Sequence, residues 1–300
     1  MKRILFLIIT IFILKLNLFC NIGELGWWIF RRPQPVKPKP LAIYGDLSGV
    51  FNNPAVCSTI DKKEVLFISD LSGFVGDSFY SVLYNHPVSF GDISFGIVYY
   101  DSGKETLYYM EDDEEKERTV SLQKDIMGFV CYGKKIKDDM FLGANLKFAN
   151  SDIAELRSAN AVALDFGLIY LLKEKIKISF ALNNIGTSTK FLEEKEDLPL
   201  SLYLAGGYSF VFPKNQNLNL AVEFPYILEE NRFIFALGLE YVIKMFSINF
   251  GYKFSDVETE GSAQFGFCIS FIKNLNLSYT FVPAKYLSSN HKLSFSWKFN

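Results

Sequence analysis

Apolar and polar residues alternate one by one along many segments of this chain, and this alternation restricts the fold more than any other feature. In the last segment Leu293, Phe295, Trp297 and Phe299 are separated by Ser, Ser and Lys. A period of two places apolar side chains on one face of a β-strand and polar side chains on the other. The same pattern recurs from residue 64 to the end of the chain, so we expect an all-β fold.

Alternation also occurs in soluble β-sandwiches, so the length and number of the segments must separate the two classes. Most segments have about 9–11 residues, the length of a tilted strand that crosses a membrane, whereas strands of soluble proteins typically have about 5–6 residues. Fourteen strands are predicted, at 64–72, 78–85, 92–100, 125–133, 139–148, 159–172, 175–184, 200–210, 217–225, 232–243, 245–254, 261–271, 274–282 and 290–299.

The connections between these segments alternate in length. The long ones are 101–124, 149–158, 185–199, 226–231, 255–260 and 283–289, and the short ones are 134–138, 173–174, 211–216, Lys244 and 272–273. Short turns at one rim and long loops at the other are typical of outer-membrane barrels, and closure leaves no unpaired strand edge in lipid. We therefore predict a 14-stranded antiparallel transmembrane outer-membrane β-barrel over residues 64–300. An even strand number places both termini on the short-turn side, which would be periplasmic.

The composition fits outer-membrane lipid as the partner of the outer face. The chain has 300 residues with 30 Phe and 16 Tyr, and the alternation directs much of this aromatic content outward. A formal net charge of −2 leaves no basic excess to neutralise phosphates, so nucleic-acid binding is not expected. The abundance of aromatic residues also excludes a disordered chain.

The first residues have the pattern of an export signal. Lys2 and Arg3 precede an apolar run, Ile4–Leu14, that has the length of a signal-peptide core and is shorter than the roughly 20 residues of a transmembrane helix. We predict a cleaved signal peptide over residues 1–20. Lipidation of Cys20 and an uncleaved anchor are the alternatives.

Two segments without alternation lie between the signal and the first strand. A Pro-rich spacer is predicted over residues 21–40, because polyproline II is favoured by Pro33, Pro35, Pro38 and Pro40. A plug that lies inside the barrel is predicted over residues 41–63, where Gly45 and Gly49 loosen the backbone and Asn53-Pro54 favours a turn.

The plug segment resembles a motif, D-x-S-x-x-x-x-N-P-A-G, of the PorV/PorQ family, a branch of the FadL-type outer-membrane barrels. The matching residues are Asp46, Ser48, Asn53, Pro54 and Ala55, and Val56 stands where the family usually has Gly. Further similar stretches follow in the same order, at 142–147, 163–167, 183–186, 198–199, 206–208, 238–241, 251–254, 277–283 and 291–296. The resemblance implies fourteen strands and an N-terminal plug, in agreement with the strand prediction.

The resemblance also implies two functions. Similarity to PorV/PorQ implies a non-enzymatic protein that binds exported proteins at the outer membrane and hands them to secretion components, as in type IX secretion. The wider FadL similarity implies the alternative, passive transport of hydrophobic small molecules through a lumen gated by the plug. We interpret the inward positions, mostly Ser, Asn, Gly and charged residues, as mild evidence against fatty-acid transport.

Enzymatic and metal-binding motifs do not occur in the sequence. There is no G-x-S-x-G, H-E-x-x-H or P-loop, and His86 and His291 do not suffice for a catalytic triad or a zinc site. Cys57, Cys131 and Cys268 have no metal-ligand spacing and are interpreted as small apolar fillers. We expect no enzymatic activity, no cofactor and no metal.

Charged residues are expected inside the lumen as well as in the longest loop. The inward-facing charges are predicted to be Lys147, Asp165, Glu223, Glu240 and Lys253. They could line a path or hold the plug, or they could form a paired network that only stabilises the barrel, because unpaired charges are costly in a low dielectric. The acidic stretch within 101–124 is interpreted as a solvated loop.

Overall fold

The computed structural model describes residues 27–30, 35–44, 46–72, 78–111, 114–154, 157–173, 175–189, 197–228, 230–254, 263–272, 274–283 and 289–300. The signal peptide predicted over residues 1–20 lies outside them. In the described part of the chain, no helix combines the length and the apolar character needed to span a membrane.

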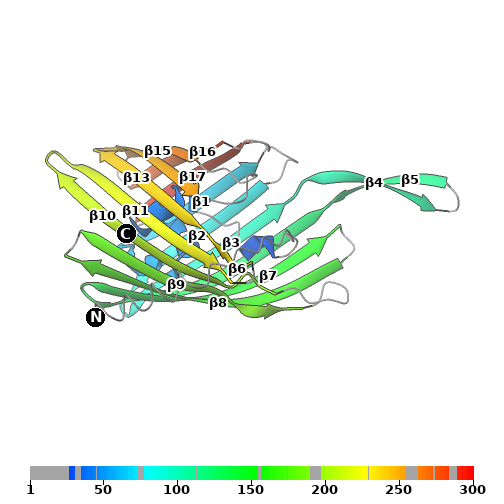
Figure 1. Cartoon of the computed structure of the whole chain (residues 1–300), viewed down its shortest axis with the longest axis horizontal. Helices are drawn as coiled ribbons and strands as arrows, with labels where there is room; N and C mark the ends of the chain where they lie inside the picture. The colour runs from blue at the N-terminus through cyan, green and yellow to red at the C-terminus, as the bar shows by residue number, and fades with distance from the viewer. Residues whose placement is uncertain are drawn as a thin grey trace.

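Fourteen antiparallel strands close into a barrel, as the alternation predicts (Figure 1). Each strand pairs with its neighbours in the chain, and the barrel closes where β1 pairs with β17, from Lys63 opposite Phe299 to Ser72 opposite Asn290. The strands are β1 (Lys63–Ser72), β2 (Ser78–Val88), β3 (Gly91–Asp101), β6 (Gln123–Lys137), β7 (Met140–Ile153), β8 (Arg157–Leu172), β9 (Ile176–Ser188), β10 (Ser201–Phe212), β11 (Gln216–Ile227), β13 (Phe235–Ile243), β14 (Phe246–Phe254), β15 (Ala263–Ile272), β16 (Leu275–Val282) and β17 (Asn290–Phe299). A two-residue strand, β12 (Arg232–Phe233), pairs with the end of β11.

The two ends of the barrel differ in their connections. Tight turns join β2 to β3, β6 to β7, β8 to β9, β10 to β11, β13 to β14 and β15 to β16, and we call this the short-turn end. Several of these turns contain residues with positive φ, among them Lys214, Asn215 and Lys244, because the mirror-image turns that suit hairpin twist need that conformation. The start of β1 and the end of β17 lie at the same end. The opposite end is called the long-loop end.

The alternation becomes an apolar outer wall and a largely buried inner face. In β17 the outward side chains Phe295 and Trp297 are exposed by 43% and 51%, whereas Ser294 and Ser296 are buried. Bulky apolar side chains are exposed in the same way on the other strands of the barrel. Lipid contact requires such a surface, and it accounts for much of the aromatic content.

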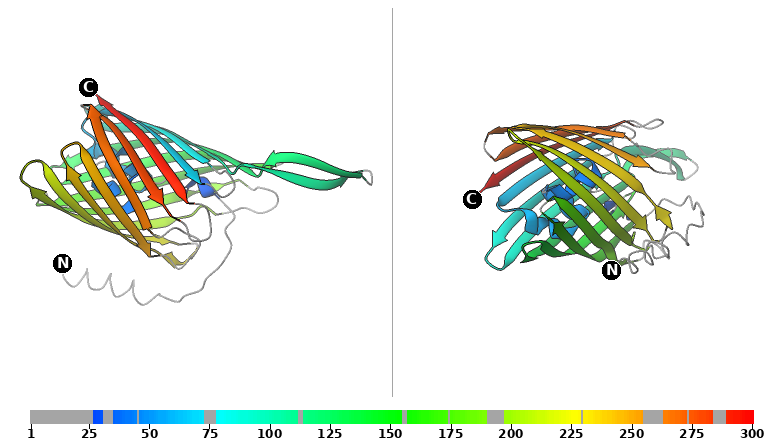
Figure 2. Two further views of the ribbon diagram at one scale, coloured as in Figure 1. Left: turned by 90° about the horizontal axis from the view of Figure 1, so that it is seen from above. Right: turned by 60° about the vertical axis from the view of Figure 1, so that its left-hand side comes forward.

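The long connection 101–124 is a hairpin, and this corrects the prediction of a solvated loop. β4 (Lys104–Glu111) pairs with β5 (Glu114–Ser121), and both project beyond the barrel at the long-loop end (Figures 1 and 2). Glu114, Glu115 and Glu117 are exposed as expected. In the pairing register, however, Leu107, Tyr108 and Tyr109 lie opposite Arg118, Glu117 and Lys116. Aromatic residues and cross-strand pairs of this kind favour strands, and the charge run hid that preference.

A chain of short 3-10 turns lies inside the barrel. These turns are η1 (Trp28–Phe30), η2 (Lys39–Tyr44), η3 (Leu47–Phe51) and η4 (Pro54–Thr59). η4 packs on β6, β7 and β8, whereas η2 packs on β10, β11 and β13. Figure 2 shows these blue turns enclosed by the strands. The insert therefore spans the lumen from wall to wall.

The described part of the predicted spacer also belongs to this insert. Pro35, Val36, Pro38 and Pro40 are buried against the wall and the turns that follow them, a placement that the prediction of a spacer over residues 21–40 did not include. Proline has no backbone N–H, so a Pro-rich segment can be buried with few unpaired donors. A Pro-rich composition is therefore compatible with a segment buried inside a barrel as well as with a linker.

Candidate functional site in the lumen

The plug motif residues first stabilise the insert itself. Asp46 precedes η3, and its Oδ1 accepts hydrogen bonds from Ser48 N at 2.9 Å and Ser48 Oγ at 2.7 Å. Ser48 Oγ in turn accepts a hydrogen bond from Val36 N at 3.3 Å. A side-chain oxygen at this position satisfies backbone donors that the first turn leaves free. Asp46 and Ser48 thus connect the Pro-rich stretch to η3.

Asn53 joins the insert to the wall. Its Oδ1 accepts a hydrogen bond from Ala55 N at 2.8 Å and so caps η4, which begins at Pro54. Its Nδ2 lies 2.7 Å from Ser179 Oγ and 3.1 Å from each of the carbonyl oxygens of Leu168 and Phe180. The acceptors belong to β8 and β9, and Asn53 is 1% exposed. The side chain therefore fills its hydrogen-bonding capacity between the plug and the wall.

Three glycines form the seat of this turn. Gly133, Gly143 and Gly167 lie side by side on β6, β7 and β8. A Cβ on Gly143 would overlap the backbone of Pro54 and Ala55, and a Cβ on Gly167 would overlap Asn53. Glycine within a strand often marks the close approach of another backbone. This signal was present in the sequence, but only the fold shows that the glycines are neighbours.

A second glycine row seats the other half of the insert. Gly207, Gly238 and Gly251 face η2 from β10, β13 and β14, with Ala221 of β11 between the first two. Side chains at these positions would overlap Tyr44, Leu41 and Pro38, respectively. Tyr44 also donates a hydrogen bond to the carbonyl oxygen of Leu220 at 2.7 Å. Both ends of the segment 38–59 are therefore fitted to the wall.

Lys147 and Asp165 form a buried ion pair on the inner face. Lys147 Nζ lies 2.7 Å from Asp165 Oδ2, and both side chains are at most 4% exposed. Asp165 also accepts hydrogen bonds from Asn145 Nδ2 at 3.1 Å and Asn184 N at 2.8 Å. Asn184 has φ 65° and lies beside a bulge in the β8–β9 pairing. The partners satisfy the buried carboxylate, as a paired network requires.

Glu240 holds the Pro-rich stretch from the opposite wall. Lys37 Nζ lies 2.6 Å from Glu240 Oε1, and Asn219 Nδ2 donates to Glu240 Oε2 at 3.0 Å. Burial lowers the pKa of Lys37, but the carboxylates of Glu240 and Asp46 outweigh it and raise that pKa above its ordinary value. Burial raises the pKa of nearby Tyr44 to about 12. Lys37 is thus charged and Tyr44 neutral at physiological pH.

The five predicted lumen charges all lie on the inner face but do not converge on one site. Glu223 accepts a hydrogen bond from Tyr203 Oη at 2.8 Å, and Lys253 is half-buried on β14. His86 lies near the short-turn end beside Tyr84, and His291 near the long-loop end beside Tyr279. No group of three or more potential metal ligands occurs among the residues that the structure describes.

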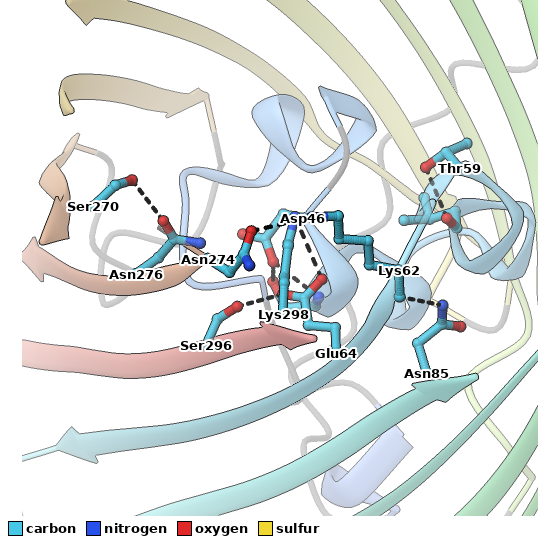
Figure 3. A network of polar contacts seen from close by, with 12 residues as sticks. Asp46, Thr59, Lys62, Glu64, Asn85, Ser270, Asn274, Asn276, Ser296 and Lys298 are labelled. Carbon is cyan, nitrogen blue, oxygen red and sulfur yellow. Dashed lines mark hydrogen bonds and ion pairs between the residues drawn. The ribbon is translucent and has the colours of Figure 1, made fainter. Parts of the chain in front are cut away.

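A polar cavity of about 270 Å³ opens between the plug and the strands at the short-turn end. Charged groups from both bodies line it, including Lys37, Asp46, Glu64, Glu240 and Lys298. Ser296 Oγ donates to Glu64 Oε1 at 2.5 Å, and Lys298 Nζ lies 3.5 Å from Glu64 Oε2 (Figure 3). This half of the lumen fits the polar inner face that the alternation predicts.

An apolar cluster, which the sequence reasoning missed, lies toward the long-loop end of the lumen. Trp27, Ile29 and Phe30 are buried there in what we call the apolar chamber. Its wall consists of Phe79, Val98, Tyr100, Met127, Ala149, Ala159, Ala161, Ala163 and Leu198. In this part of β2 and β3 both faces are apolar, since Tyr80 and Tyr99 point outward while Phe79 and Tyr100 stack inside with centroids 4.4 Å apart. The sequence signal for this apolar inner face was the lack of alternation at Phe79–Tyr80 and Tyr99–Tyr100.

Comparison with solved structures places this architecture among known channels. The structure is similar to the Pseudomonas putida toluene transporter TodX, with a TM-score of 0.57, 12% identity, and coverage of 87% of this chain and 95% of TodX. The Ralstonia pickettii toluene transporter TbuX is similar with a TM-score of 0.57 and 9% identity, and the match covers 84% of this chain and 94% of TbuX. CymD, a monoaromatic hydrocarbon channel, is similar with a TM-score of 0.54 and 10% identity, and the match covers 90% of this chain and 99% of CymD.

The fold is a closed antiparallel barrel of fourteen strands, similar to these solved structures. At this level of identity the similarity establishes the fold and not the activity. No family model and no curated protein matches the sequence. The PorV/PorQ assignment suggested by the plug motif therefore receives no support, although the barrel of fourteen strands that the same motif implies is confirmed.

Proposed function

We propose that this protein is a non-enzymatic outer-membrane channel for hydrophobic small molecules. The observation that carries the proposal is the apolar chamber, where Trp27, Ile29 and Phe30 pack against apolar side chains of the wall toward the long-loop end. TodX and TbuX, which share the fold, are described as toluene transporters. A chamber that accommodates aromatic side chains has the chemistry to accommodate aromatic solutes.

The plug divides the lumen into two chemically different halves. Residues 35–60 are held by Asn53, by the Lys37–Glu240 pair and by two glycine rows. Burial of an apolar side chain contributes about 1.5–3 kcal/mol, so a small aromatic solute can replace Trp27 or Phe30 in the chamber at little net cost. Within the proposal, residues 27–30 yield to the solute while residues 35–60 remain seated.

The proposed orientation places the long-loop end outside the cell and the short-turn end, with both termini, in the periplasm. A hydrophobic solute would then meet the chamber first and the polar cavity last. An epitope inserted between Glu111 and Glu114, at the tip of the β4–β5 hairpin, tests this orientation. Antibody labelling of intact cells is expected, and labelling only after the cells are broken would reverse the orientation.

Uptake of a radiolabelled monoaromatic hydrocarbon tests the channel. Cells that lack their own channels for it should accumulate more of the label when they produce this protein. Ala161→Trp fills the chamber and should reduce uptake to the level of cells without the protein. Ala144→Trp is the matched control, because Ala144 points outward on β7. Equal uptake in all these strains would refute the proposal.

Handover of exported proteins is the second candidate. The feature that favours it is the β4–β5 hairpin, which projects beyond the barrel (Figure 1) and on which Tyr108 and Met110 are exposed by 66% and 67%. Deletion of the hairpin should then strand cargo in the periplasm while aromatic uptake continues. Unchanged surface cargo would eliminate this role.

A further inference from the structure

Two cysteines that are 74 residues apart in the sequence meet at the boundary between plug and wall. Cys57 belongs to η4 and Cys131 to β6, and their Sγ atoms are 3.5 Å apart. Both side chains are completely buried. The sequence interpretation, which treated the cysteines as unrelated apolar fillers, did not foresee this contact because no local spacing encodes it.

The surroundings hold both thiols in place. Cys131 Sγ lies 3.4 Å from the carbonyl oxygen of Pro54, at the start of the same turn that carries Cys57. Gly133, two residues further along β6, provides the space that Cys57 Sγ occupies, since a Cβ there would overlap it. Hydrogen bonds of Asn53 to β8 and β9 anchor the turn on its other side. The two sulfur atoms are therefore neighbours because Gly133 and Asn53 position η4 on the wall.

We propose that Cys57 and Cys131 are a disulfide site that joins the plug covalently to the barrel wall. A disulfide has an S–S length of about 2.05 Å, so the sulfur atoms must approach by roughly 1.5 Å from the observed separation. Rotation of the Cys57 side chain and a small shift of η4 can supply this movement, because η4 is a short turn and β6 is fixed by two neighbouring strands.

The chemistry balances with a disulfide-bearing thiol oxidoreductase as oxidant. Two S–H bonds break and one S–S bond forms between Cys57 and Cys131. The two electrons and two protons reduce the oxidant's disulfide to a dithiol. Since both thiols are buried in the folded barrel, the oxidant forms a mixed disulfide with one thiol while the exported chain is still folding. The second thiol then displaces the reduced oxidant as η4 reaches its seat. Oxidising compartments favour such bonds in exported proteins.

Cys268 provides an internal comparison. It lies on β15 and lines the polar cavity, on the side of the lumen away from η4. Its strand neighbours at the same level are Ser247 and Ser278. Oxidation should therefore leave Cys268 as a thiol, and a bond that involved Cys268 would show that pairing is random.

The bond has a specific consequence, which depends on the channel proposed above. It fixes the turn 53–59 to β6, at the half of the plug that the first glycine row seats. A solute path that opens in the oxidised protein must then form elsewhere, by movement of residues 27–30 or of η2. Transport would continue without removal of the whole plug.

Peptide mass mapping tests the disulfide without reference to transport. The full-length barrel is refolded with oxidised glutathione, denatured, alkylated and digested. We expect a linked pair of peptides containing Cys57 and Cys131, lighter by two hydrogens than the reduced pair, with Cys268 alkylated. Alkylation of both Cys57 and Cys131, or linkage of either to Cys268 as often as to each other, would overturn the proposal.

Single variants guard against a folding artefact. Cys57→Ser and Cys131→Ser should each abolish the linked peptides, whereas Cys268→Ser should retain them. Because these measurements detect a bond, they are independent of the uptake assay. Absence of uptake by both redox forms would remove the channel and leave the disulfide, whereas absence of the linked peptides removes the disulfide and leaves the channel.

Discussion

Asn53 of the plug and Ser179 of the wall are joined by a hydrogen bond of 2.7 Å between Nδ2 and Oγ, across 126 residues of sequence. The same amide caps η4 through its oxygen. One side chain thus organises a turn and attaches that turn to the barrel. The fold of the plug and its position in the lumen consequently depend on the same residue.

Asn53→Ala should loosen the plug and leave the barrel folded. The change removes the cap and the wall contacts, and buried hydrogen-bonding groups left without partners cost about 1–3 kcal/mol each. Asn53→Asp retains an oxygen for Ala55 N but loses the amide donors, so it separates the two roles. Limited proteolysis between residues 35 and 60 measures the effect. Unaltered protease resistance in both variants would show that the contacts do not hold the plug.

Gly143→Ala should displace the turn from its seat. The new methyl group would overlap the backbone of Pro54 and Ala55, and overpacking of this kind costs about 1–3 kcal/mol. We expect higher ion conductance in planar bilayers, because a displaced plug obstructs the lumen less. Gly128→Ala is the matched control, since a Cβ at Gly128 has open space around it. Equal conductance of the two variants would show that Gly143 does not hold the turn in its seat on the wall.

Lys147→Met should destabilise the barrel strongly. It leaves Asp165 buried with only amide donors around it, and breaking a buried ion pair from one side costs about 3–5 kcal/mol. The double variant Lys147→Met/Asp165→Asn should recover part of the loss, because the orphaned charge is gone. Lys135→Met removes the exposed pair with Asp138 and should change stability little. On a gel, the folded barrel runs as a separate band from the heat-denatured protein. The urea concentration at which half of this folded band is lost measures the stability of each variant.

The Lys37–Glu240 pair should make plug docking sensitive to alkaline pH. The raised pKa of Lys37 means that its contribution is complete below the unfolded value of 10.5 and is lost as pH rises through the higher folded value. Glu240→Gln removes the main charge that raises the pKa of Lys37 and leaves burial, which lowers that pKa, as the largest influence. The loss of docking at alkaline pH should then disappear, and the plug should already be less protected at neutral pH. Cleavage by an alkali-tolerant protease between residues 35 and 60 follows the release. An unchanged profile in Glu240→Gln would argue against the pair.

The strands were predictable because their signal is local. A wall one residue thick, with lipid on one side and a wet lumen on the other, imposes a period of two on each strand, as in β17. Turn residues such as Lys244 mark where strands reverse. The hairpin β4–β5 escaped prediction because both of its faces are solvated, so no burial pattern distinguishes them.

The candidate site was predictable only in part. Asp46, Ser48, Asn53, Pro54 and Ala55 were identified through resemblance, and the five lumen charges through strand parity. The pairings of those charges were not identifiable, since Lys37 and Glu240 are far apart in sequence. The apolar chamber was missed because, where Phe79 and Tyr80 are both apolar, hydrophobicity does not tell which of them faces lipid.

By itself the sequence determined a closed barrel of fourteen strands and the face of each strand that is apolar, because alternation needs no partner. Only the tertiary structure decided that the Pro-rich stretch enters the lumen, that Gly133, Gly143 and Gly167 lie side by side, and that Cys57 meets Cys131. The physical reason is that barrel closure brings residues of distant strands to one level of the lumen. No local pattern records which of them will meet across the plug.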